Sequence, residues 1–196
     1  MRAQAHLLAE EWPMSRLQDA SILIVVSFLT VASVRGGASD STLTRIRSTE
    51  HAMSEIIRAG VARSPTFRHL VQTLERSDLI VYVEPSNSVD GGYLRFATVA
   101  GRSRWVQVVV NPKRPINQIL AMIGHELQHA IEISEAPSVV DEATMAGLYR
   151  RIGVKSCGNP ARACYETRGA QVTGATIFRE LSGRSVPPEG LACELR

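Results

Sequence analysis

Residues 115–134 read PINQILAMIGHELQHAIEIS, and this stretch is the most informative part of the sequence about fold and function. Its apolar residues recur three and four positions apart, which is the period of a helix with one buried face. They are Ile116, Ile119, Leu120, Ile123, Leu127, Ala130 and Ile131. Because proline is favoured in the first turn of a helix, Pro115 marks the start of the segment. We therefore predict one amphipathic helix from Pro115 to about Ser134.

Two histidines of this helix, His125 and His129, lie on the side opposite the apolar residues. Positions four apart in an α-helix differ by about 40° around the axis, so both imidazoles point the same way, one turn apart. Two neutral imidazoles placed like this can bind one tetrahedral Zn²⁺ and leave two further positions for other ligands. The alternative is a solvated helix face with two incidental histidines.

Glu126 follows the first histidine and lies at the flank of the same face. In the pattern His-Glu-x-x-His the glutamate acts as a general base. It takes a proton from water activated by the metal and passes it to the leaving amine. Residues 125–129 therefore predict a metal-dependent hydrolase.

The HELQH motif at residues 125–129 resembles that of the zincin metallopeptidases, and the resemblance covers roughly residues 104–181. It implies a zinc-dependent enzyme that hydrolyses peptide bonds in a peptide or protein substrate. It also implies an active-site helix packed under a twisted sheet, whose edge strand binds an extended peptide by backbone pairing. That strand would fall within residues 93–110, and strand addition of this kind suits an exposed sheet edge.

The third metal ligand has to come from outside the motif. Metzincin-like enzymes would need Gly at 132 and His at 135, where this chain has Glu132 and Glu135, so that subclass is excluded. The gluzincins take a glutamate from a later helix, and resemblance to them implies Glu166 as the ligand. Glu142 is the rival, although an acidic residue in the first turn of a helix is explained without a metal. Glu132 and Glu135 are expected to be solvated or bracing carboxylates.

Small residues surround Glu166 on its predicted helix. They are Gly169, Ala170, Thr173 and Gly174. Side chains of this size would let that helix approach the motif helix closely.

The chain has three cysteines, and two of them, Cys157 and Cys164, bracket a loop-like stretch. We predict that they form a disulfide, which would fix the backbone two residues before Glu166. The alternative is two separate buried thiols. Cys193 is left without a predicted partner.

Hydrolysis also needs a hydrogen-bond donor for the oxyanion. We predict Tyr165 as this catalytic donor, with Tyr149 as a second candidate. Either tyrosine can instead be a half-buried aromatic residue on a helix face. His51 and His69 are expected to be surface or structurally satisfied histidines.

The other elements predict an α+β fold, with a small three-stranded sheet, antiparallel or mixed, packed on the motif helix and on further helices. One helix begins at Ser64 as N-cap, with Pro65 in its first turn. The predicted strands, rich in β-branched and aromatic residues, are 79–83, 93–99 and 104–110. Two further helices are predicted at 141–152 and 164–181.

Residues 20–34 read ASILIVVSFLTVASV, an uncharged apolar run that is short for a membrane span and typical of a secretory signal. We predict that residues 1–38 are a signal peptide or an uncleaved N-terminal membrane anchor. The protein would then be exported to the periplasm, cell envelope or medium. Residues 39–183 would form the hydrolase domain, and residues 184–196 an irregular tail. The alternative is that residues 20–34 form a buried element of the domain.

The composition suits one globular domain, because 196 residues with 44% hydrophobic and 21% charged residues can build a core. The net charge is +3 and there are no long blocks of one sign, so we exclude nucleic acid as a partner. A second hypothesis is a non-catalytic exported domain that binds a partner. Its zinc would be structural, closed by a thiolate from Cys157 or Cys164.

Overall fold

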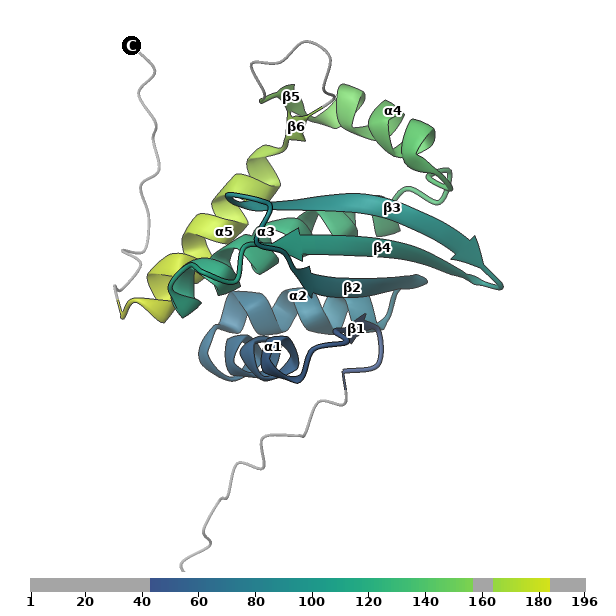
Figure 1. Cartoon of the computed structure of the whole chain (residues 1–196). Coiled ribbons are helices and arrows are strands. Elements are labelled where there is room, and N and C mark those ends of the chain that lie inside the picture. The colour runs from purple at the N-terminus through teal and green to yellow at the C-terminus, as the bar shows by residue number, and fades with distance from the viewer. Residues whose placement is uncertain (1–42, 157–163, 184–196) are drawn as a thin grey trace, which may run out of the picture. The chain divides into compact units, whose positions relative to one another are not determined.

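Figure 1 shows the fold, a computed structural model that describes residues 43–156 and 164–183. The predicted α+β class is confirmed, with five helices and six strands in these residues. The strands are β1 (Ile46–Arg47), β2 (Leu79–Pro85), β3 (Gly92–Ala100), β4 (Ser103–Val110), β5 (Val154–Lys155) and β6 (Tyr165–Glu166). The helices are α1 (His51–Arg63), α2 (Pro65–Glu75), α3 (Ile116–Ser134), α4 (Glu142–Ile152) and α5 (Arg168–Leu181).

Four strands form a mixed sheet in the order β1-β2-β4-β3. β1, β2 and β4 run parallel, and β3 pairs antiparallel with β4. The turn between β3 and β4 contains Gly101 at a φ of 61°, a left-handed conformation that glycine adopts without strain. The three predicted strands are present, whereas β1 was not predicted because two residues are too few to carry an alternating pattern. Within the described residues, β3 forms one free edge of this sheet.

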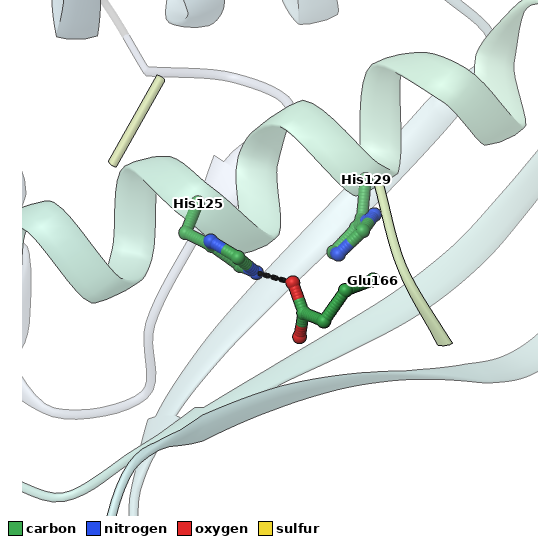
Figure 2. A group of neighbouring side chains, drawn as sticks. All are labelled: His125, His129 and Glu166. Carbon is green, nitrogen blue, oxygen red and sulfur yellow. Dashed lines mark ion pairs between the residues drawn. The ribbon is translucent and has the colours of Figure 1, made fainter. Parts of the chain in front are cut away.

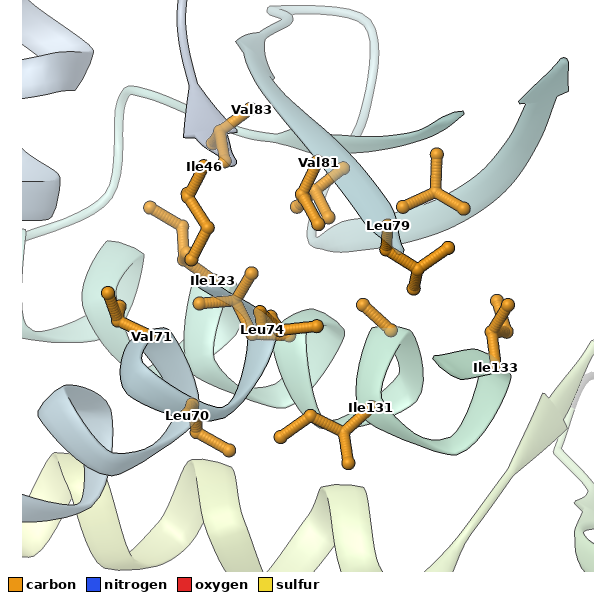
Figure 3. Close-up of a cluster of buried hydrophobic side chains, with 14 of the residues drawn as sticks. Ile46, Leu70, Val71, Leu74, Leu79, Val81, Val83, Ile123, Ile131 and Ile133 are labelled. Carbon is orange, nitrogen blue, oxygen red and sulfur yellow. The ribbon is translucent and has the colours of Figure 1, made fainter. Parts of the chain in front are cut away.

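The core lies between the sheet and helices α1, α2 and α3. Alternate side chains of β2, namely Leu79, Val81 and Val83, point toward α2 and α3 (Figure 3). Ile123 and Leu127 on α3 are fully buried against them. Burial of each such side chain stabilises the fold by roughly 1.5–3 kcal/mol. The apolar face of α3 is therefore fixed, and its histidine face turns toward α4 and α5.

Arg104 stabilises the C-terminal end of α3. Its side chain is buried, and its Nε lies 2.7 Å from Oδ2 of Asp78 in an ion pair. The guanidinium also donates to backbone carbonyl oxygens at and beyond the helix end. These carbonyls belong to Ile133, Ser134, Ala136 and Val139. The last carbonyls of a helix lack partners inside the helix, so Arg104 satisfies acceptors that burial would otherwise leave unpaired.

Two predicted helix starts agree with the structure. Ser64 caps α2, because its Oγ accepts a 3.0 Å hydrogen bond from the amide of Phe67, and Pro65 is the first helical residue. Pro115 precedes α3, which ends at Ser134 as predicted. Both ends of the motif helix could therefore be predicted from the local sequence pattern.

The predicted helix at 164–181 is wrong in its first turn. Tyr165–Glu166 form β6, which pairs antiparallel with β5, and α5 begins at Arg168. Thr167 is the N-cap: its Oγ1 accepts a 3.1 Å hydrogen bond from the amide of Ala170. Thr167 has the extended backbone of an N-cap, and the two residues before it are held in a strand by their pairing with β5. Glu166 therefore comes from a strand and not from a helix.

Several predictions concern residues outside the described ranges. They are the leader at 1–38, the tail at 184–196 with Cys193, and the pairing of Cys164 with Cys157. Across residues 43–156 and 164–183, we find no helix that has both the length and the hydropathy to cross a membrane.

Candidate metal centre

Three predicted ligands come together in the structure. One ligand atom from each of His125, His129 and Glu166 lies within 4.8 Å of the others. Figure 2 shows the two imidazoles descending from consecutive turns of α3 toward the Glu166 carboxylate. This group is close enough to hold a metal ion.

The two histidines converge as their spacing predicts. The ring centroids of His125 and His129 are 5.0 Å apart, and the ring planes meet at 80°. Burial lowers the pKa of His125 below its usual value, against the opposing pull of the Glu166 charge. A lowered pKa favours the neutral imidazole, which is the form that binds metals.

Glu166 carries an acceptor atom that has no hydrogen-bond donor. Its Oε2 lies 3.0 Å from Nε2 of His125, a distance suited to an ion pair, yet the contact lacks the alignment of a hydrogen bond. Oε2 is buried and has no hydrogen-bond partner among the described residues. An unsatisfied buried carboxylate oxygen is costly, and a cation shared with the imidazole would supply the missing partner.

Helix α5 packs tightly against α3 beside this group. A Cβ at Gly174 would lie 3.2 Å from the carbonyl oxygen of Ala121 and 3.2 Å from Cβ of His125. Conversely, a Cβ at Gly124 on α3 would lie 2.1 Å from Cδ1 of Ile177. Glycines on both helices thus permit the close approach that the small residues after Glu166 led us to expect.

His129 is held from two sides. Its Nδ1 lies 2.8 Å from Oε2 of Glu132, and its backbone carbonyl accepts a 2.8 Å hydrogen bond from the hydroxyl of Tyr149. Burial lowers the pKa of His129, but the Glu132 hydrogen bond and the surrounding carboxylates outweigh burial, so the net pKa is raised. The ring is therefore oriented, and in the metal-free protein the carboxylates around it favour its protonated form, which a bound metal would displace.

Glu126, the predicted base, lies beside the group and is only 6% exposed. Burial raises its pKa to about 7; the positive charge of His129 opposes this effect and the negative charge of Glu166 adds to it. A base with a pKa near neutrality can both accept and release a proton at physiological pH. Gly92 lies next to it: a Cβ at Gly92 would be in ordinary van der Waals contact with Oε1 of Glu126, at 3.5 Å.

A cleft of about 690 Å³ opens on the group, between the start of β3 and helix α4. Glu126, His129 and Glu166 all line it. Tyr165 lines the same cleft, whereas the hydroxyl of Tyr149 is committed to the backbone of His129. Of the two candidate oxyanion donors, Tyr165 is the one whose hydroxyl is not engaged in this way.

The free edge of β3 borders the cleft. The backbone N–H of Asn111 donates to the carbonyl of Gly91 at 3.0 Å, so the carbonyl of Gly91 faces β4. Along a strand, the backbone groups of one residue face one neighbouring strand and those of the next residue face the other side. The backbone groups of Gly92, and of Leu94 two residues later, therefore point away from β4. Both residues line the cleft.

Glu142, the rival ligand, has another partner. Its Oε1 accepts a 3.0 Å hydrogen bond from the amide of Phe96, on the outward side of β3. It lies at the first residue of α4, where an acidic side chain is favoured in any case. The structure does not bring Glu142 into the His125–His129–Glu166 group.

No protein-family model, curated protein or solved structure matches this chain. What the site can do is therefore inferred from its own chemistry: two imidazoles and a carboxylate around one point, a buried acid beside them, and a cleft on one side.

Two residues near the site were missed or left undecided by sequence reasoning. Glu132 lies three residues after His129, a spacing at which helical side chains meet, and it was left between a solvated and a bracing role. Thr167 was not predicted as part of the site. A threonine directly before a helical segment is typical of an N-cap, but nothing local indicates that its hydroxyl reaches Glu132.

Proposed function

We propose that this protein is a zinc-dependent metallopeptidase of the zincin type, gluzincin-like in taking a glutamate as third ligand. In this proposal His125, His129 and Glu166 bind the metal and Glu126 is the general base. The observation that carries the proposal is the convergence of three donor atoms within 4.8 Å beside a buried carboxyl group.

The donor set suits Zn²⁺. Imidazole nitrogen and carboxylate oxygen are common zinc ligands. Catalytic zinc sites use three protein ligands and keep a position for water or substrate, whereas structural sites use four protein ligands. In the part of the chain that the structure describes, three metal-ligating side chains form the group, and a cleft borders it. This favours a catalytic site over a closed structural one.

Zinc in this site would supply a Lewis acid that polarises the substrate carbonyl and lowers the pKa of water. Glu126 would take a proton from the attacking water and transfer it to the nitrogen of the leaving amine. Its pKa of about 7, raised by burial, suits both halves of this transfer. Tyr165 would donate its hydroxyl to the oxyanion that forms on the carbonyl.

The substrate would bind as an extended peptide along β3. The outward backbone groups of Gly92 and Leu94 can pair with a peptide strand, as free sheet edges commonly do. This pairing would lay the peptide beside Glu126, because Gly92 adjoins its carboxylate. Substrate recognition would thus rest largely on the peptide backbone.

The test combines metal analysis with an activity screen on an unbiased peptide library. Glu126→Gln should retain stoichiometric zinc and lose turnover, because an amide cannot act as the base. His129→Ala should lose zinc. Glu135 is an exposed residue just beyond α3, so Glu135→Gln is the control and should match the wild type in zinc content and turnover. Absence of zinc from the wild-type protein, or retained hydrolysis in Glu126→Gln, would contradict the proposal.

We also infer export from the apolar run at residues 20–34, followed by small residues at Gly36, Gly37 and Ala38. N-terminal sequencing of the mature protein from its native host tests this inference. A mature protein that begins at the first residue and is recovered from the cytoplasm would contradict it.

A further inference from the structure

Resting on the metal site proposed above, we infer that Glu132 is a positioning residue that sets metal affinity. It joins His129 on α3 to the segment that carries Glu166. Each oxygen of its carboxylate holds one of these two parts of the site.

The first contact orients the imidazole. Oε2 of Glu132 lies 2.8 Å from Nδ1 of His129, and both side chains are largely buried. An ionised carboxylate can only accept hydrogen bonds, so Nδ1 of His129 carries the proton. The other ring nitrogen, Nε2, then keeps its lone pair for a metal. Glu132 therefore selects the tautomer in which His129 can bind a metal through Nε2.

The second contact reaches the third ligand. Oγ1 of Thr167 donates a 2.6 Å hydrogen bond to Oε1 of Glu132. The same hydroxyl accepts the amide of Ala170 at 3.1 Å, so its position is fixed by the first turn of α5. Thr167 directly follows Glu166 and is buried. Through this hydroxyl, Glu132 links the start of α5 to the motif helix.

The two contacts together explain how ligands from distant segments keep one geometry. Glu132 and Thr167 are separated by 35 positions in the chain, yet one carboxylate binds both Thr167 and the ring of His129. Without this link β6 could shift relative to α3, and Glu166 would move away from the imidazoles. Loss of such outer contacts typically weakens metal binding by about 10- to 100-fold.

The test measures the Zn²⁺ dissociation constant by competition with a chelator, together with the thermal midpoint of the metal-free protein. Glu132→Ala is compared with Glu135→Ala, which removes an exposed carboxylate three residues further along. We expect zinc binding about 10- to 100-fold weaker in Glu132→Ala and unchanged in Glu135→Ala. A purely structural role would lower the metal-free midpoint without changing zinc affinity in the folded protein.

A second pair of variants separates position from charge. Thr167→Val keeps the charge of Glu132 but removes the hydroxyl that holds it, together with the N-cap of α5, whereas Thr167→Ser retains both contacts. Zinc affinity should fall in Thr167→Val and be restored in Thr167→Ser. This pair also decides the matter if Glu132→Ala does not fold.

The outcomes are distinguishable. Equal zinc affinity in Thr167→Val, Thr167→Ser and the wild type, or equal affinity in the two glutamate variants where both fold, would overturn the role of Glu132 and leave the metallopeptidase proposal standing. A wild-type protein that binds no zinc would overturn both.

Discussion

The hydroxyl of Tyr149 donates a 2.8 Å hydrogen bond to the backbone carbonyl of His129, and the two rings meet edge to face with centroids 5.1 Å apart. Tyr149 belongs to α4 and His129 to α3, so this contact fixes α4 beside the metal group. Burial raises the pKa of Tyr149, which keeps its hydroxyl protonated as a donor at every physiological pH.

Tyr149→Phe is expected to destabilise the protein without abolishing activity. Removing one buried hydrogen bond typically lowers the free energy of unfolding by about 0.5–1.5 kcal/mol. Urea denaturation of the metal-free protein measures this change. Turnover should stay within a few-fold of wild type, because the hydroxyl is bound to backbone. A hundredfold loss of turnover with normal zinc content would assign Tyr149 a catalytic role instead.

Tyr165→Phe is expected to lower turnover strongly without destabilising the protein. If Tyr165 supplies the oxyanion donor, kcat should fall by roughly 10²–10³, the usual effect of removing one such donor. Zinc content and the urea midpoint should match those of the wild type. Unchanged kcat would remove Tyr165 from the mechanism and leave it as an aromatic wall of the cleft.

Gly124→Ala is expected to destabilise the fold although alanine is the better helix former. The new Cβ would lie 2.1 Å from Cδ1 of Ile177, and overpacking of this kind costs typically 1–3 kcal/mol. Gly147→Ala on α4 is the matched control, because its nearest contacts are arginine tips at 3.9 Å. The control should gain up to about 1 kcal/mol from helix propensity. Thermal unfolding of both variants tests whether Gly124→Ala lowers stability and Gly147→Ala raises it.

Glu142→Ala separates the two candidate third ligands. The structure pairs Glu142 with the amide of Phe96, so zinc stoichiometry and affinity should not change. Stability should fall by about 1 kcal/mol through the lost hydrogen bond. Glu166→Ala, measured beside it, should lose zinc. Loss of zinc from Glu142→Ala together with retention in Glu166→Ala would reverse the assignment.

Acid should weaken the contact between Asp78 and Arg104. The hydrogen bond from Arg104 lowers the pKa of Asp78 below its ordinary value of 3.8, and the positive charge of the guanidinium adds to the effect. A group with a lowered folded pKa stabilises the protein fully above its unfolded pKa and loses that contribution as the pH falls through the folded value. Stability of the wild type should therefore fall below about pH 4 more steeply than that of Asp78→Asn. Parallel curves of unfolding free energy against pH for the two proteins would contradict this linkage.

Local spacing was sufficient for the motif helix and for the convergence of its histidines. Pro115, the apolar period and the four-residue interval between His125 and His129 are properties of one continuous helix, whose geometry varies little between proteins. The strands β2, β3 and β4 were predictable for a similar reason, since β-branched runs bounded by turns favour extended backbone. The short strand β1 escaped prediction because its two residues form no pattern of their own.

Contacts between segments far apart in the chain could not be predicted from local spacing. Resemblance to the gluzincins favoured Glu166 over Glu142, but which of the two carboxylates joins the imidazoles is decided by how β6 and α4 pack against α3. The hydrogen bonds of Glu132 to Thr167, of Tyr149 to the carbonyl of His129 and of Arg104 to the end of α3 likewise join residues 20 to 35 positions apart. Periodicity within one helix or strand places side chains on a face, but the partner opposite that face is set by the packing of the whole core.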